Sequence, residues 1–296
     1  MRWIFLAVVA ACSSAAPKPP AAHTQYRGGT ADRARVDDAN MLQIEAGPYV
    51  AGSTVEERTE AYDAYRETAG HDTARERGWF KREREPHQGT LPAFVIDATP
   101  VTNAAFAEFV ADTGIAAPAI DEAHWNKQGF SQDYATEVAR FNWVDGAVPE
   151  GREEHPVVLV TWRDAAAYCA WRSAVVGQTR RLPTAQEYEK AARGTRGVLY
   201  PWGDRFDASK LNSAVSGPRD TTPVGSFEDG ASPFGMLDAA GNVFQWTATP
   251  WDQKPRSMTV KGSAWDDYGG LGRPAAAHGR PRTVRHAIVG FRCAGS

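Results

Sequence analysis

The sequence has 296 residues, enough for two average domains or one large one. Hydrophobic residues make up 42% of it, which excludes a largely disordered chain. The 33 lysines and arginines nearly balance 36 aspartates and glutamates, and a net charge of −3 provides no positive field to attract nucleic acid. The 27 glycines, 19 prolines and 10 tryptophans favour a loop-rich domain with aromatic anchors over a helical bundle.

The N-terminus has the pattern of a secretory signal peptide. A short positive region precedes an apolar run over residues 3–9, which is too short to span a bilayer. Small residues follow, and the four residues that end at Cys12 resemble a bacterial lipobox. We therefore expect a signal peptide over residues 1–11, a lipidated Cys12, and export to the bacterial periplasm or the outer membrane surface. The alternative is an ordinary cleaved signal in which this cysteine is incidental.

Residues 12–40 are small, polar and rich in proline, alanine and glycine, the composition of a flexible tether. The globular part begins at residue 41 and runs to residue 296 without a second linker. We expect one domain there, attached to the membrane only through the lipid. We also expect it to be a monomer that does not bind nucleic acid.

The first elements of this domain are a hairpin and a charged helix. Residues 41–52 alternate apolar and small side chains, which predicts a hairpin that turns at Gly47 and Pro48. Residues 54–85 mix opposite charges with sparse aromatic residues. This pattern predicts a largely solvated helix lying on the body of the domain, and a helix that docks a partner is the alternative.

A buried strand is predicted over residues 94–96, followed by a helix that Thr102 caps and that ends before Gly114. Residues 115–153 show little periodicity, which indicates a long ordered excursion that could shape a groove. Exposed aromatic residues are expected in this excursion; they are Trp125, Phe130, Tyr134, Phe141 and Trp143.

The apolar run over residues 156–161 predicts a strand, and residues 164–176 predict a helix. Thr184 and Glu187 form a capping-box pattern at the start of the next helix. Beyond Gly197 the sequence is typical of turns and short strands.

The domain carries a series of short motifs in a fixed order. They are FVID at 94–97, VTN at 101–103, HPVV at 155–158, AYCAW at 167–171, RLPT at 181–184, AARG at 191–194, YPWG at 200–203, TPVG at 222–225, GNVFQW at 241–246 and GFRC at 290–293. In this order residues 41–296 resemble the formylglycine-generating enzyme (sulfatase-modifying factor) family. The resemblance implies a single compact α+β domain with little regular secondary structure, related to the C-type lectin core.

The family's founding members oxidise a cysteine of sulfatases to formylglycine with copper held by two thiolates, and Cu(I) prefers such soft ligands. The first of these cysteines lies three residues after the serine of a Gly-Ser pair, and the second lies five residues further on. Counted from Ser263, the two positions are Asp266 and Leu271. A carboxylate and an isobutyl group cannot replace two thiolates, so we expect no copper-thiolate site and no formylglycine-generating activity by that mechanism.

The resemblance implies a structural calcium site, because family members bind Ca²⁺ just before the Gly-Asn motif. The matching ligands are the Asp238 side chain and the backbone carbonyls of Ala239, Gly241 and Val243. A second family site begins at a position that matches Asn212. We doubt that second site, since its later acidic ligand has no counterpart in residues 216–222.

The resemblance also implies a disulfide between Cys169 and Cys293, the two cysteines that remain once Cys12 is assigned to lipid. An exported location permits such a bond.

Two classes of function remain open. The first is a binding module whose surface groove holds an extended peptide or a glycan; Trp125, Trp143, Trp251 and Trp265 could stack on such a ligand, or could equally be core residues. The alternative is a non-haem metal-dependent oxidoreductase that modifies a peptide or a small metabolite in the groove, similar to relatives in ergothioneine synthesis and in pyoverdine maturation. The candidate catalytic residues near the groove are Ser263, Trp265, Asp266, Arg273 and His278. The sequence shows no ligand pattern for a redox iron: none of the seven histidines is paired at a spacing of four.

Overall fold

The computed structural model describes residues 40–252 and 256–296. The predicted signal peptide, Cys12 and the tether up to residue 39 lie outside this part. No helix within it is long and apolar enough to cross a membrane.

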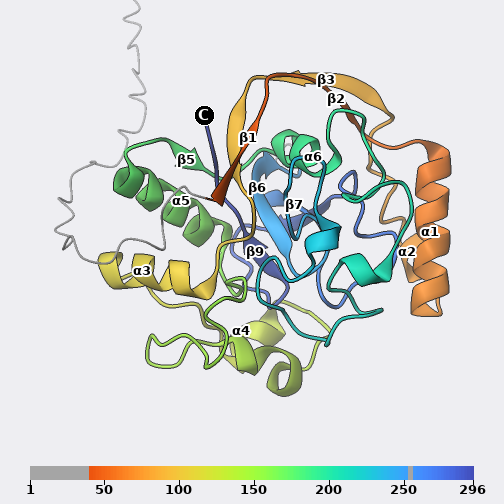
Figure 1. Cartoon of the computed structure of the whole chain (residues 1–296). Helices are drawn as coiled ribbons and strands as arrows, with labels where there is room; N and C mark the ends of the chain where they lie inside the picture. Colours follow the sequence, from red (N-terminus) through yellow and green to blue (C-terminus); the bar gives the residue numbers. More distant parts are fainter. Residues whose placement is uncertain (1–39, 253–255) are drawn as a thin grey trace, which may run out of the picture. The chain divides into compact units, whose positions relative to one another are not determined.

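Helices and single turns of helix alternate with long irregular segments (Figure 1). The helical elements are α1 (Val55–Ala69), α2 (Thr73–Glu76), α3 (Asn103–Thr113), α4 (Glu122–Lys127), η3 (Tyr134–Val138), η4 (Ala139–Phe141), α5 (Trp162–Val176), α6 (Ala185–Arg193), η5 (Ala208–Lys210) and η6 (Glu228–Gly230). The predicted helices after Thr102, over 164–176 and after Thr184 are confirmed as α3, α5 and α6. In each, the threonine before the helix accepts a backbone N–H of the first turn, and this bond defines where the helix begins.

The strands form three small sheets. They are β1 (Met41–Ile44), β2 (Gly47–Ala51), β3 (His87–Leu91), β4 (Phe94–Asp97), β5 (Arg180–Arg181), β6 (Phe244–Pro250), β7 (Ser257–Lys261), β8 (His278–Pro281), β9 (Val289–Phe291) and β10 (Ala294–Gly295). The first sheet has the order β1-β4-β10-β5, the second pairs β2 with β3, and the third has the order β8-β7-β6-β9. All pairs are antiparallel except β6 with β9, so the fold is α+β, as the resemblance implied.

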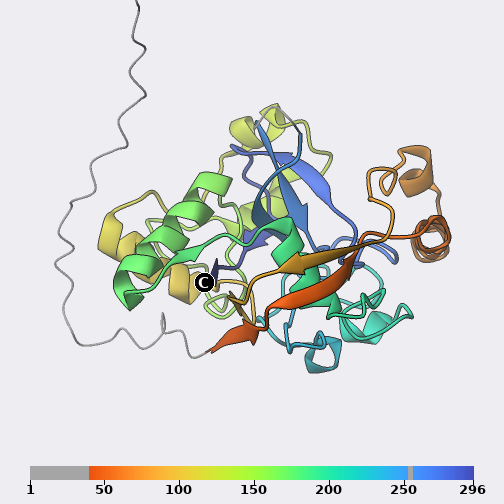
Figure 2. The ribbon, with the colours of Figure 1, turned by 90° about the horizontal axis from the view of Figure 1, so that it is seen from above.

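The predicted hairpin over residues 41–52 is wrong. β1 pairs with β4 and β2 pairs with β3, so the chain passes from one strand to the next without reversing at Gly47. The chain returns as β3 and β4 only after α1 and α2. The outgoing strands β1 and β2 and the returning strands β3 and β4 lie side by side as a bent ribbon (Figure 2). The sequence pattern showed two strands correctly but could not show that their partners come from residues 87–97.

The predicted strand over residues 156–161 is also wrong, although its burial is as expected. Four consecutive side chains, from Val157 to Val160, are buried. Leu159 has a φ of 58°, which breaks an extended conformation. The backbone instead bonds to irregular neighbours, with the Val157 N–H on the carbonyl of Val101 and the Leu159 N–H on that of His286. The apolar run is therefore a core segment without a strand partner.

The main hydrophobic core surrounds the disulfide between Cys169 of α5 and Cys293, whose sulfurs are fully buried. Phe106 of α3, Tyr168 of α5 and Phe291 of β9 pack around it with ring centroids 5.3–6.2 Å apart. The bond that the resemblance implied thus joins the central helix to the C-terminal segment. A smaller cluster lies between the first sheet and α6.

Residues 54–85 form two helices rather than one, and most of their side chains are exposed or half-buried, as predicted for a largely solvated segment lying on the body. Thr54 caps α1 with both bonds of a capping box, and Gly70 ends it in a left-handed conformation. Tyr62, Tyr65 and Phe80 are buried against the body. In Figures 1 and 2, α1 and α2 lie on the flank opposite α3 and α5. The structure shows no partner on this segment, and the docking alternative stays untested.

Candidate functional site

The five candidate groove residues follow β7 in sequence, and the polar groups of three of them, Ser263, Trp265 and Arg273, are engaged by contacts within the domain. Ser263 is buried, and its Oγ accepts the Gly241 N–H at 2.8 Å. Trp265 is buried, and its Nε1–H donates to the carbonyl of Ala287 at 3.4 Å. These two side chains hold the loop after β7 in place, and neither presents a polar group to a ligand.

The α1–α2 segment packs against the loop after β7. The Gly269 N–H donates to Thr68 Oγ1 of α1 at 2.9 Å. Gly270 has a φ of +85°, and a Cβ there would lie 2.2 Å from the carbonyl oxygen of Ala61. Only a glycine allows the backbone of α1 to come this close. The loop that carries the candidate residues therefore packs against α1 within the domain.

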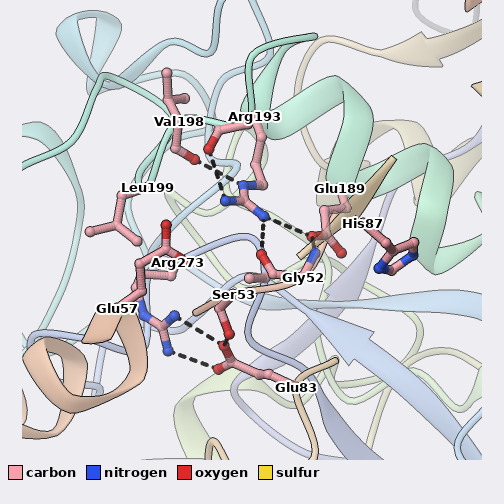
Figure 3. A network of polar contacts seen from close by, with 12 residues as sticks. Gly52, Ser53, Glu57, Glu83, His87, Glu189, Arg193, Val198, Leu199 and Arg273 are labelled. Atoms are coloured by element: carbon pink, nitrogen blue, oxygen red, sulfur yellow. Dashed lines mark hydrogen bonds and ion pairs between the residues drawn. The ribbon is translucent and has the colours of Figure 1, made fainter. Parts of the chain in front are cut away.

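Arg273 is part of that contact and is not a groove residue. Its guanidinium is fully buried and makes two bonds to the Glu83 carboxylate, at 3.0 and 2.8 Å. Ser53 Oγ donates to the same carboxylate (Figure 3). The guanidinium also lies 4.7 Å from the centre of the Phe80 ring. A buried pair of this kind is stable only while both charges are present.

Asp266 and Asp267 are half-buried, and the loss of water around their carboxyl groups is the main reason that their pKa values are raised. The pKa of Asp266 rises to about 6, and its Oδ2 receives a weak bond from Gln132 at 3.4 Å. The pKa of Asp267 is raised further, because Asp266 adds a like charge beside it. The Arg280 guanidinium opposes both shifts. Asp266 Oδ1 is buried without a hydrogen-bond partner.

His278, at the start of β8, is a neutral buried imidazole. Burial, together with the positive charges of Arg280 and Lys261, lowers its pKa to about 3. The ring packs edge-on against Trp79 and Phe244, and its Nε2 has no hydrogen-bond partner. Within the described residues, no three His, Cys, Asp or Glu side chains come together in a way that could hold a metal ion.

The residues expected to bind calcium offer hard oxygen donors, which suit Ca²⁺. The Asp238 carboxylate is buried and accepts the Gly225 N–H at 2.7 Å, and burial raises its pKa. The carbonyl of Ala239 accepts the Tyr188 hydroxyl at 3.0 Å, which leaves one of its lone pairs. The Arg292 guanidinium bonds to the Asp238 carbonyl at 3.2 Å and brings a competing positive charge. The donor set fits calcium in type, and the site stays a prediction.

Asn212, the doubtful second calcium residue, has a buried Oδ1 without a partner. Such an orphaned oxygen suits a cation. However, the next acidic side chain after Asn212 along the chain, Asp220, is bound by Arg152 through two bonds of 2.9 and 2.6 Å. It is not free to complete a calcium shell, so the absence of an acidic ligand remains the argument against this site.

A cavity of about 400 Å³ lies where the segments before β3, helix α6 and strands β6 and β7 meet, and we call it the α6 cavity. None of the five candidate groove residues lines it. Its lining residues are Ala51, Gly52, Arg82, Glu83, Arg84, His87, Ala185, Gln186, Glu189, Thr249, Pro250, Trp251, Thr259, Lys261, Ala275 and Ala277.

A buried polar network forms one wall of the α6 cavity (Figure 3). Glu189 Oε1 accepts the Gly52 N–H at 2.8 Å and Arg193 NH1 at 3.0 Å, and its Oε2 accepts Lys261 Nζ at 3.3 Å. Arg193 also donates to the carbonyls of Gly52, Gly197 and Val198. Since these donors and acceptors come from segments far apart in sequence, the network fixes the shape of the wall.

The tryptophans expected to stack on a ligand are mostly core residues. Trp125, Trp143 and Trp265 are between 0% and 5% exposed, so they cannot receive a sugar or a peptide without unfolding. Of the two alternatives for these three residues, core packing is the one that the structure shows. Trp251 is the exception, since it is half-buried and lines the α6 cavity.

A larger hollow of about 680 Å³ lies against the excursion over residues 115–153, as the groove prediction suggested. Its charged groups are already paired: His124 lies 2.7 Å from Asp121, and Arg285 lies 2.9 Å from Asp164. The α6 cavity is therefore the better candidate for a charged or polar ligand.

Comparison with known proteins assigns the chain to a family. The family described as "Sulfatase-modifying factor enzyme 1-like domain" matches residues 28–296. The chain belongs to the sulfatase-modifying factor family. The inactive C-alpha-formylglycine-generating enzyme 2 of Mus musculus is 34% identical over 261 residues, which cover 70% of this chain and 76% of that protein. The formylglycine-generating enzyme of Mycobacterium tuberculosis is 30% identical over 281 residues, covering 73% and 91%.

Among solved structures, PvdO of Pseudomonas aeruginosa shares the fold with a TM-score of 0.65 at 21% identity. The match covers 86% of this chain and 94% of PvdO. The family resemblance read from the motifs is therefore confirmed, together with the α+β fold class.

The resemblance places the two copper-binding cysteines of the family's oxidases at Asp266 and Leu271 of this sulfatase-modifying factor domain. Both cysteines in the described residues, Cys169 and Cys293, are joined in the disulfide. Asp266 is a half-buried carboxyl group, and Leu271 is a buried apolar side chain of the main core. The residues at these two positions do not fit a Cu(I) ion.

The sequence did not reveal the α6 cavity. Lys261 directly precedes the Gly-Ser pair, and Glu189 lies on the capped helix α6, yet neither was singled out. The one available signal in the sequence was the lysine at the end of an apolar segment. The structure shows that this lysine is buried, and lysines are almost never buried without a partner.

Proposed function

We propose that this chain is a ligand-binding member of the sulfatase-modifying factor family that does not oxidise cysteine with copper. Its ligand occupies the α6 cavity. The observation that carries the proposal is the cavity itself: about 400 Å³, with one apolar side, one aromatic side chain and a rigid polar wall. Small-molecule sites have this size and this mixture of surfaces.

The absence of copper chemistry is supported by the chain's own residues. The disulfide uses the two described cysteines, and a carboxylate and a leucine lie where the family's oxidases have thiolates. The names of the relatives do not decide the point, since one is called inactive and the other formylglycine-generating.

The cavity has room for a small metabolite or for a single side chain of a peptide, and not for an extended peptide or glycan along its whole length. Trp251 supplies one stacking surface, whereas a glycan-binding groove usually presents several exposed rings. Of the three ligand classes predicted from the sequence, a small metabolite is the one we favour.

A screen of small organic molecules against isotope-labelled protein tests this proposal by NMR. Ligands are expected to shift the indole signal of Trp251 and to leave those of the core residues Trp125 and Trp246 unchanged. The variant Ala277→Phe fills part of the cavity and should abolish the shift while keeping the folded spectrum. A screen without binders, or binding that survives Ala277→Phe, would refute the α6 cavity as the site.

A metal-dependent oxidoreductase is the second candidate. The observation that favours it is two buried side-chain atoms without a hydrogen-bond partner: Asp266 Oδ1, at one of the two positions of the family's active cysteines, and His278 Nε2. The described residues do not assemble three ligands there. Metal analysis of the purified protein decides between the two: iron at one equivalent, lost in Asp266→Asn, would support the oxidoreductase.

We also propose that the protein is exported and anchored through a lipid on Cys12. The lipobox-like residues before Cys12 and the tether composition after it support this. Cys12→Ser should move the protein from the membrane fraction to the soluble fraction. Equal membrane association of the variant would contradict the anchor.

A further inference from the structure

The α6 cavity is lined by more positively charged than negatively charged side chains. Its lining includes two carboxylates, three cations and one histidine, namely Glu83, Glu189, Arg82, Arg84, Lys261 and His87. Both carboxylates form ion pairs with cations. Two of the three lining cations, Arg82 and Arg84, form no ion pair with another described residue.

Each carboxylate serves an arginine that does not line the cavity. Glu83 is held by both terminal nitrogens of Arg273. Glu189 is held by Arg193, and it is shared with Lys261 through its second oxygen. One carboxylate thus faces two buried cations, which leaves a positive charge uncompensated at the wall of the cavity.

Lys261 is the cation that this surplus leaves available. Its side chain is 2% exposed, and its ammonium group makes two long contacts, of 3.3 Å each, to Glu189 Oε2 and to the carbonyl of Ala275. An ammonium group has three N–H donors, so one donor is left. A buried cation is stable only with its donors satisfied, and the cavity is the space beside it.

Two arginines at the rim add to the positive charge. Arg82 and Arg84 are exposed, and neither makes an ion pair with another described residue. Arg82 lies over the Trp251 ring, 5.2 Å from its centre, and so places a guanidinium next to the aromatic wall. Arginine pairs readily with carboxylates and phosphates through two parallel bonds.

We propose that the α6 cavity binds the anionic oxygen group of a small organic ligand, with Lys261 as its buried partner and Arg82 and Arg84 at the entrance. The proposal rests on the proposed function and adds the chemical class of the ligand. The remaining body of the ligand lies against Trp251, Ala275 and Ala277, which are apolar surfaces of the same cavity. The ligand is therefore an acid with a flat or apolar part.

Benzoate and its neutral analogue benzamide test the proposal, since they share a shape and differ in charge. Binding to the full chain is followed by NMR at the Trp251 indole, and inorganic phosphate serves as an anion without an apolar part. We expect benzoate to bind and benzamide to bind at least about tenfold more weakly, the factor that one hydrogen bond to a charged group provides. Phosphate should compete with benzoate, and added salt should weaken both.

Three variants complete the test. Lys261→Met should weaken benzoate binding by about tenfold or more, because a hydrogen bond to a charged group is lost. Glu189 keeps Arg193 and the Gly52 N–H in that variant, so the fold should persist. Arg82→Gln with Arg84→Gln changes only exposed side chains and should slow association. Lys127→Met removes an exposed positive charge far along the chain, on α4, and should change nothing.

The outcomes separate this inference from the proposed function. Equal binding of benzoate and benzamide, both lost in Ala277→Phe, would keep the cavity as a binding site and overturn its preference for anions. Unchanged benzoate affinity in Lys261→Met would also overturn the inference. Failure of every small molecule to shift Trp251 would refute the proposed function itself.

Discussion

The buried pair between Glu83 and Arg273 gives a sharp test of how the α1–α2 segment is held. The side chains of Glu83 and Arg273 are 3% and 0% exposed, and two bonds join them. Glu83→Gln removes the negative charge, keeps the size, and leaves the guanidinium buried without a counter-charge. Breaking one side of a buried ion pair costs about 3–5 kcal/mol, so we expect the free energy of unfolding to fall by that amount.

Glu85→Gln is the matched control, because it makes the same change two residues further on. Glu85 pairs with Arg58 but is 69% exposed, and an exposed pair contributes about 0–1 kcal/mol. Urea unfolding followed by circular dichroism measures both variants against the unaltered protein. Amide hydrogen exchange along α1 should accelerate in Glu83→Gln alone. Equal losses of stability in the two variants would refute the reasoning.

Three further predictions concern the candidate ionic and covalent features. Burial raises the pKa of Asp266 from 3.8 to about 6, so its contribution to stability is present below pH 4 and lost as the pH rises through about 6. Asp266→Asn should flatten part of this fall in urea midpoints measured from pH 4 to 7, and an unchanged profile would contradict the burial. Replacing Cys169 and Cys293 together by alanine should lower stability by about 4–5 kcal/mol, given a sequence separation of 124; a loss below about 1 kcal/mol would contradict this contribution to stability. Removing calcium with EDTA should lower the melting temperature, and Asp238→Asn should reduce that effect; an unchanged melting temperature in EDTA would refute the calcium site.

The elements with a strong local signal could be predicted from the sequence. Thr102, Thr161 and Thr184 each cap a helix through their own side chains, so residues close in sequence determine where each helix begins. The motif order gave the family and the Cys169–Cys293 pairing. These features depend on a few residues or on a pattern that the family repeats.

The contacts that decide the candidate site could not be predicted in the same way. The partners of β1 and β2 come from residues 87–97, across the whole α1–α2 segment. The burial of Arg273 depends on Glu83, which is separated from it by 190 residues. Only the folded structure shows that this segment lies over the loop after β7.

The central claim is that this family member does not oxidise cysteine with copper. An assay for aldehyde formation tests it most directly. The purified protein is supplied with Cu(I), oxygen and a cysteine-containing sulfatase peptide, and the peptide is analysed by mass spectrometry. We expect no aldehyde above the level of a protein-free control, because neither Asp266 nor Leu271 is a thiolate. Formation of several equivalents of aldehyde per protein molecule would contradict the claim.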